Sequence, residues 1–197
     1  MKSDRVSMAI PFRSQLVDLS AADLEGFRSI SDARHWQERG CGIACVRMIL
    51  EALRPDAPLP RYGEMVYEGL EMNACCERGW IHEGLIRLAR AHGVSGRAFR
   101  RTRAEDVADQ IRGDRPCIVS VTAAFEGGNA DEAGRPLPPG GHLAVAFGYS
   151  QDETGLQGFL VHHPSSWPGY NWPAKWVDGQ SFERSFSGNF MAFGSCL

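Results

Sequence analysis

The stretch WQERGCGIACVRMILEAL, residues 36–53, contains the strongest structural signal in the sequence. From Cys41 onward apolar side chains recur three or four residues apart, Cys45 lies one turn further on, and Pro55 ends the pattern. This spacing predicts an α-helix that begins at Cys41. Unpaired N–H groups and the positive dipole end at a helix N-terminus lower a cysteine pKa and favour the nucleophilic thiolate. Cys41 is therefore a candidate nucleophile, and a small buried core residue is the alternative.

The remaining segments change in character along the chain, from helical to strand-like. Three further helices are predicted, at residues 62–71, 80–92 and 103–112. After Pro116 the apolar segments become β-branched and aromatic, which predicts strands. These strands are CIVSVTA (117–123), HLAVAFGYS (142–150), GFLVHH (158–163) and NFMAFG (189–194). Helices followed by strands indicate an α+β fold, with N-terminal helices packed on a C-terminal antiparallel β-sheet.

Length and composition narrow the function classes. The 197 residues suit one domain, and we assign residues 1–34 to an N-terminal arm with a short helix near 21–30 and residues 35–197 to the functional domain. A net charge of -3 without a basic cluster argues against nucleic-acid binding. The N-terminus shows neither a signal peptide nor a membrane span, so we expect a cytoplasmic protein and no membrane partner. The six cysteines lack metal-ligand spacing, so we expect free thiols, no metal and no cofactor.

A cysteine nucleophile needs a base, and His142 is the candidate. It opens a strand in which His142, Ala144 and Ala146 share one face, and small side chains there allow the Cys41 helix to approach closely. A surface histidine is the alternative. The Gly/Pro-rich loop before it, residues 125–141, is either a lid or a mobile insertion.

Two further residues complete the candidate site. His163 ends the strand FLVHH before Pro164 and is a candidate for the group that orients His142. Alternation along this strand predicts that only one of His162 and His163 faces inward. Gln37, four residues before Cys41, offers a side-chain amide for an oxyanion hole, with an exposed polar residue as the alternative.

The segment around Cys41 resembles the nucleophile segment of the bacterial C39-like cysteine peptidases, which have a papain-like fold. The segments GWIHEGLIRLARAHG, GGHLAVAFGYS, FLVHHPSS and FERSFSGNF follow in the order of that family, so the resemblance covers about residues 36–193. It implies Cys41 as nucleophile, His142 as general base and acid, Gln37 as oxyanion donor, and cleavage of a peptide or amide bond through a thioester.

The sequence departs from the family pattern in two places. Gln37 is closer to the cysteine than in papain-like enzymes, and His163 occupies the position where the family has Asp or Asn. A neutral imidazole accepts a hydrogen bond but does not supply the anionic stabilisation of a carboxylate. Asn171 and Asp178, further along the chain, are other candidates for the orienting group.

Three functional hypotheses follow from these residues. The first is a cysteine peptidase or amidase acting on a peptide or amide substrate, with a peptide or acyl transferase of the same fold as a variant. The second is a catalytically silent C39-like peptide-binding module, which the histidine in the acid position favours. The third is a nucleotide-related activity, because a family described as guanylyl-cyclase-like has a similar cysteine segment; the absence of a Gly-rich phosphate loop argues against it.

Overall fold

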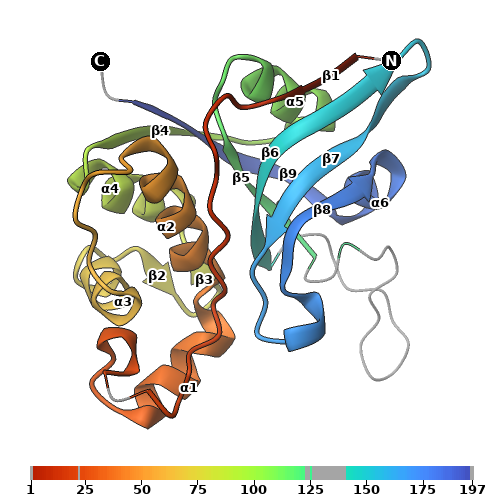
Figure 1. Cartoon of the computed structure of the whole chain (residues 1–197). Helices are drawn as coiled ribbons and strands as arrows, with labels where there is room; N and C mark the ends of the chain where they lie inside the picture. Colours follow the sequence, from red (N-terminus) through yellow and green to blue (C-terminus); the bar gives the residue numbers. More distant parts are fainter. Residues whose placement is uncertain (1, 22, 123–124, 126–140, 196–197) are drawn as a thin grey trace.

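A seven-stranded antiparallel sheet forms the centre of the molecule (Figure 1). The computed structural model describes residues 2–21, 23–122, 125 and 141–195. Six strands follow the order β4-β9-β5-β6-β7-β8, and β1 pairs with β6. The strands of this sheet are β1 (Lys2–Arg5), β4 (Val94–Phe99), β5 (Cys117–Val121), β6 (His142–Asp152), β7 (Gly155–His163), β8 (Trp172–Asp178) and β9 (Phe186–Ser195). A separate hairpin consists of β2 (Cys75–Cys76) and β3 (Gly79–Trp80).

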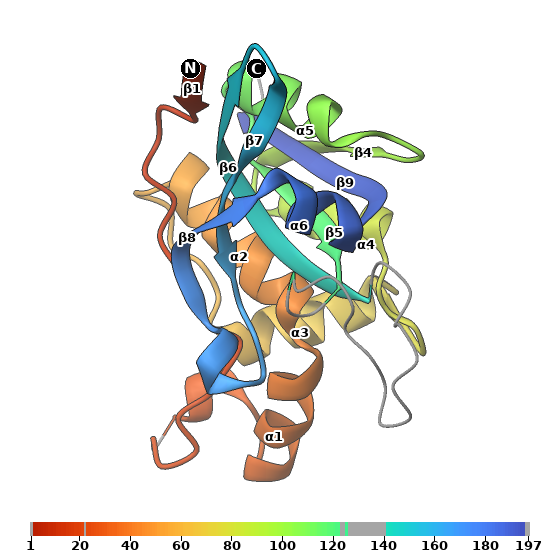
Figure 2. The same cartoon turned by 90° about the vertical axis from the view of Figure 1, so that its right-hand side faces the viewer.

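Most of the helices lie between β1 and β4 along the chain. They are α1 (Ile30–Arg39), α2 (Cys41–Leu53), α3 (Tyr62–Glu71), α4 (His82–Ala91), α5 (Ala104–Arg112) and α6 (Gly179–Ser185), with short 3-10 turns η1 (Leu24–Gly26) and η2 (Pro168–Tyr170). Figure 1 shows α1 to α4 together on one side of the sheet, and Figure 2 shows α6 in front of the opposite face. The predicted α+β fold, with N-terminal helices packed on an antiparallel sheet, is confirmed; the short α6 was not predicted.

Helix α2 places the candidate nucleophile against the sheet. It begins at Cys41, as its apolar spacing predicts, and its inner residues such as Ile43 and Met48 are fully buried. The helix packs on β6, where Ala144 and Ala146 are also fully buried. Small side chains on the strand allow close approach, so the start of α2 lies beside the start of β6.

The first 34 residues contribute to the core and to the sheet. β1 pairs with β6 from Lys2 to Arg5, and buried side chains such as Val6 and Ile10 join the core. The helix predicted near residues 21–30 is wrong in position, because the structure has only η1 there and α1 begins at Ile30, where Ser29 caps it. The domain boundary at residue 34 stays a prediction.

The segment after β7, residues 165–179, is rich in aromatic residues, proline and glycine, a composition that gives only a weak local strand signal. Within it, β8 nevertheless pairs with β7 along Gly158–His163. The pairing has a register shift between Val161 and His163, and Pro173 is tolerated because β8 is the edge strand of the sheet. Pairing with the regular strand β7 therefore stabilises a strand here, although the local sequence signal for one is weak.

His162 connects three segments that are distant in sequence. Its Nε2 hydrogen bonds the carbonyl of Ile10 at 2.8 Å, and its Nδ1 accepts from the backbone N–H of Ala174 at 2.9 Å. Because a carbonyl only accepts, the ring is neutral with its proton on Nε2, and burial lowers the pKa of His162 in the same direction. The side chain therefore ties the N-terminal segment to β7 and β8.

Removing this connection is expected to destabilise the fold. His162→Ala leaves the carbonyl of Ile10 without its partner in a largely buried position, so the free energy of unfolding should fall by about 2 kcal/mol. Urea unfolding followed by circular dichroism measures the loss. His35→Ala, at an exposed histidine of α1, is the matched control. Equal stability of the two variants would contradict this role of His162.

Candidate active site

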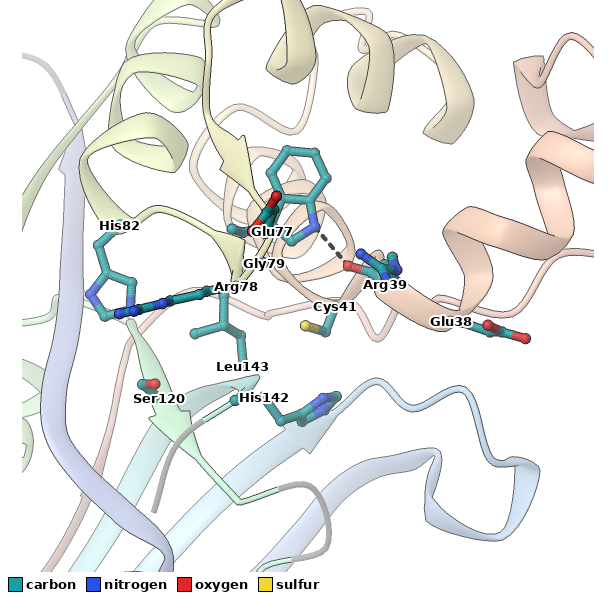
Figure 3. A pocket seen from close by; sticks show the side chains of 12 residues that line it. Glu38, Arg39, Cys41, Glu77, Arg78, Gly79, His82, Ser120, His142 and Leu143 are labelled. Carbon is teal, nitrogen blue, oxygen red and sulfur yellow. Dashed lines mark hydrogen bonds between the residues drawn. The ribbon is translucent and has the colours of Figure 1, made fainter. Parts of the chain in front are cut away.

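Cys41 and His142 line one pocket of about 300 Å³ between the helical side and the sheet. Figure 3 shows the Cys41 sulfur directed toward the start of β6, where His142 and Leu143 lie. Backbone hydrogen bonds reach the sulfur from Leu143, Gly42 and Cys41 itself. The two residues that the sequence singles out as nucleophile and base are thus brought together, while their catalytic roles stay predictions.

Trp80 forms a wall of the pocket that sequence reasoning did not identify. Its indole N–H donates to the carbonyl of Arg39 at 2.7 Å, just before the nucleophile (Figure 3). Its side chain also lies so close to Gly42 that a Cβ there would approach Trp80 Cγ to 2.7 Å. Glycine at position 42 therefore permits the contact between indole and helix. The signal in the sequence that could have indicated this contact is the Gly-Cys-Gly run at residues 40–42.

The protonation state of Cys41 differs from the expectation for a helix N-terminus. Burial raises the pKa of the Cys41 thiol to about 11, although the backbone hydrogen bonds from Leu143 and Gly42 act in the opposite direction. Desolvation of a charged sulfur outweighs the stabilisation by N–H groups at this position. The expected lowering of this pKa is therefore wrong, and Cys41 is a neutral thiol at neutral pH.

His142 is held by a backbone carbonyl. Its Nε2 lies 2.6 Å from the oxygen of Pro164, and because a carbonyl only accepts, Nε2 carries the ring proton. The lone pair of the neutral ring is then on Nδ1, the nitrogen that remains to act as a base. Burial lowers the pKa of His142 to about 3, with a further contribution from His163, while the bond to Pro164 raises it.

His163 contacts His142 by packing. It is fully buried, and the two ring centroids are 4.6 Å apart. Its Nδ1 donates to the carbonyl of Tyr170 at 2.6 Å, and its ring packs against Trp172. The hydrogen bond that the structure shows from the His142 ring goes to the Pro164 carbonyl. The contact of His163 with the base is a packing contact between the two rings. His162 is also buried, but it packs against Phe147 and hydrogen bonds Ile10, so of the two histidines it is His163 that faces His142.

Asn171 shapes the turn that carries the Pro164 carbonyl. Its Oδ1 accepts from Ser165 N–H at 3.1 Å, and its Nδ2 donates to the Ser165 carbonyl at 2.7 Å. It therefore acts on the residue next to Pro164 and reaches His142 only indirectly. Asp178, the other downstream candidate, caps α6 by accepting from Ser181 N–H and has no part in this turn.

Gln37 is not among the residues that line the pocket, although Glu38 and Arg39 are. Its Oε1 accepts from the backbone N–H of Val17 at 3.5 Å. Its carbonyl accepts from the side chain of Gln15 at 2.7 Å, and Gln15 is almost fully buried, a contact that nothing in the sequence analysis indicated. This geometry offers no support for the oxyanion role of Gln37, which stays a prediction.

The remaining expectations concern metal ligands, membrane-spanning helices and the loop before His142. Within the described ranges no group of three metal-ligating side chains occurs, and no helix is long and apolar enough to cross a membrane. The loop predicted as a lid or insertion, residues 125–141, lies outside the described residues except for its two ends.

The overall arrangement of helices and sheet matches solved peptidase domains. A putative C39-like peptidase from Bacillus anthracis superposes with a TM-score of 0.63, covering 100% of this chain and 99% of that chain at 14% identity. The chain has a C39-like peptidase fold. A double glycine motif protease from an AMS/PCAT transporter, solved with its leader peptide, superposes at 0.54 over 98% and 95% of the two chains at 16% identity.

A third structure supports the same C39-like fold. The peptidase domain of Streptococcus ComA, a bifunctional ABC transporter, superposes at 0.51 over 80% of this chain and 93% of that domain at 15% identity. No family model matches the sequence, and no curated protein matches it. The likeness at these identities concerns the C39-like fold alone.

The buried base predicts how stability depends on pH. His142 stays neutral in the folded protein down to about pH 3, whereas its ordinary pKa is 6.5. Between these values the unfolded chain binds more protons, so stability is highest above pH 6.5 and falls as the pH falls through this window. The expected contribution is about 1.4 kcal/mol per pH unit. We expect the free energy of unfolding, measured with urea, to change less between pH 7 and pH 5 in His142→Gln than in the native chain. An equal change in both proteins would contradict the lowered pKa of His142.

Proposed function

We propose that this C39-like chain is a cysteine-nucleophile hydrolase that cleaves a peptide or amide bond, with Cys41 attacking and His142 as general base. The observation that carries the proposal is the pairing of the two side chains in one pocket, with the tautomer of His142 set by the Pro164 carbonyl. A peptide substrate is favoured by the solved protease of this fold that holds a leader peptide.

The proposed reaction begins from a neutral pair. The thiol proton of Cys41 passes to Nδ1 of His142 as the sulfur attacks the substrate carbonyl carbon, and the carbonyl oxygen becomes an oxyanion. The backbone N–H of Cys41, which lies beside its sulfur, is placed to donate to that oxyanion. His142 then returns the proton to the leaving nitrogen, the C–N bond breaks and a thioester forms. A water molecule, deprotonated by His142, hydrolyses the thioester and restores the thiol.

The Pro164 carbonyl replaces the usual side-chain orienter in this scheme. It holds Nε2–H while Nδ1 takes the proton, and its dipole stabilises the imidazolium that forms transiently. It carries no full negative charge, so the imidazolium is stabilised less than beside a carboxylate. This arrangement favours transfer of the proton during attack over a preformed thiolate–imidazolium pair.

The test is the rate of Cys41 alkylation by iodoacetamide as a function of pH, followed by peptide mass spectrometry. Cys76, an exposed thiol of the same protein, is the internal reference. In the native chain Cys41 is expected to react at least about tenfold faster than Cys76 at pH 7, because the base removes its proton during attack. The rate should vary little between pH 5 and pH 9. In His142→Ala it should be slow at pH 7 and rise steadily toward pH 11.

The silent peptide-binding module is the second candidate function. The raised pKa of Cys41 and the histidine in the acid position favour it. It predicts that Cys41 reacts more slowly than Cys76 at pH 7, both in the native chain and in His142→Ala. That result would exclude the proposed hydrolase.

A further inference from the structure

The pocket has polar groups on the side facing away from His142. Figure 3 shows Arg78, His82 and Ser120 there, and all three line the same pocket as Cys41. They come from three separate elements, the β2–β3 turn, the start of α4 and strand β5. The proposed mechanism uses none of these three side chains.

Arg78 is the charged member of this group. It is the second of the two residues in the turn of the β2–β3 hairpin, and its side chain extends toward His82 and Ser120 and away from Glu77 (Figure 3). Among the residues that the structure describes, its guanidinium forms no ion pair or hydrogen bond. Its N–H donors are therefore available to a ligand in the pocket.

His82 and Ser120, toward which Arg78 extends, add hydrogen-bond donors without a negative charge. Glu77 and Glu38 also line the pocket, but they lie away from this group (Figure 3). Burial lowers the pKa of His82, so its ring is neutral at neutral pH and carries one N–H donor. Ser120 contributes a hydroxyl. The nearest acidic residue to His82 along α4, Glu83, is engaged by Arg100. Positive charge and hydrogen-bond donors thus gather at one end of the pocket, and the nucleophile lies at the other.

We propose that Arg78, with His82 and Ser120, binds a carboxylate of the substrate, so that this chain prefers peptides or amides with a carboxylate close to the scissile bond. Arginine pairs with carboxylates through two parallel hydrogen bonds, which orients the ligand as well as attracting it. The carboxylate belongs to an acidic side chain or to a peptide C-terminus, which have the same chemistry. This subsite proposal rests on the proposed hydrolase function, because it places the substrate carboxylate with respect to Cys41, the nucleophile of that reaction.

The test compares three iodoacetyl-dipeptide probes of Cys41. The first carries a glutamate side chain and an amidated end, the second a glutamine and a free C-terminal carboxylate, and the third a glutamine and an amidated end. Mass spectrometry follows alkylation of Cys41 by each. An acidic probe is expected to react about tenfold faster than the neutral one, and the faster of the two acidic probes identifies the source of the carboxylate.

Two arginine variants locate the effect. Arg78→Gln should abolish the preference for an acidic probe, whereas Arg39→Gln, which removes a charge from another part of the same pocket, should keep it. An equal rate for all probes in the native chain would overturn the proposal. So would an equal loss of preference in both variants, because that indicates general attraction of anions rather than a subsite.

A second measurement separates this proposal from the proposed function. If none of the three probes modifies Cys41, the hydrolase fails, and the subsite is tested by NMR titration of the His82 ring. N-acetylglutamate should raise the pKa of His82, N-acetylglutamine should not, and Arg78→Gln should remove the effect, since a bound carboxylate favours the charged imidazole. An unchanged His82 pKa with N-acetylglutamate would overturn the carboxylate subsite.

Discussion

Cys41→Ala is expected to lower the turnover of peptide or amide substrates by at least about 10⁴-fold. Alanine has no group that forms a thioester, and no other cysteine among the described residues lines the pocket with His142. Release of fluorescence from a library of quenched peptides measures the effect. Thermal unfolding of the variant should match that of the native chain within a few degrees, because the substitution removes one sulfur atom and keeps the Cβ.

Cys76→Ala is the matched control for this loss. Cys76 is an exposed thiol in the hairpin next to the pocket, so its removal tests the effect of deleting any nearby sulfur. Turnover of this variant should stay within twofold of the native value. Comparable activity in Cys41→Ala would show that hydrolysis depends on another nucleophile.

Gly42→Ala is expected to lower the free energy of unfolding by about 3 kcal/mol. The new Cβ would lie 2.7 Å from Cγ and 2.9 Å from Cβ of Trp80, so either the indole or the start of α2 must move. Movement of the indole also breaks its hydrogen bond to the Arg39 carbonyl. Urea unfolding measures the stability, and a red shift of tryptophan fluorescence reports the displaced indole.

Gly169→Ala controls for the general effect of a glycine replacement. A Cβ at Gly169 meets no atom within 4 Å and its backbone is not left-handed, so a change below about 0.5 kcal/mol is expected. The Gly42→Ala variant should also alkylate at Cys41 more slowly, because the turn before the nucleophile shifts. A Gly42→Ala variant as stable as Gly169→Ala would show that Trp80 relaxes without cost.

The fold was largely predictable because its strongest signals are local. The helix from Cys41 to Leu53 has the predicted bounds, since its apolar spacing and the following proline act within one segment. The strands containing Ile118, Val145 and Met191 were also predictable, because they are continuous apolar segments that end at turn residues. β4 and β8 were missed, since their mixed polarity is compatible with a strand only once a neighbour is present to pair with them.

The candidate site was predictable in part. The sequence identified Cys41 and His142, because a helix start and a strand start are positions with local signatures. It also indicated His163 as the orienting group and Gln37 as an oxyanion donor, and both roles stay predictions. In the structure His163 packs against His142, and Gln37 contacts the N-terminal segment. Residues that orient a base are selected by distance in space, and a short motif does not encode that distance.

The sequence by itself determined the fold class, the helix that presents Cys41 and the strand that His142 opens. Only the tertiary structure decided that the Pro164 carbonyl holds the base, since any residue supplies a carbonyl and its use depends on the path of the chain. The protonation of Cys41 was also a tertiary property. Burial sets its pKa, and burial arises from the packing of distant segments around the sulfur, which outweighs the local effect of the helix end.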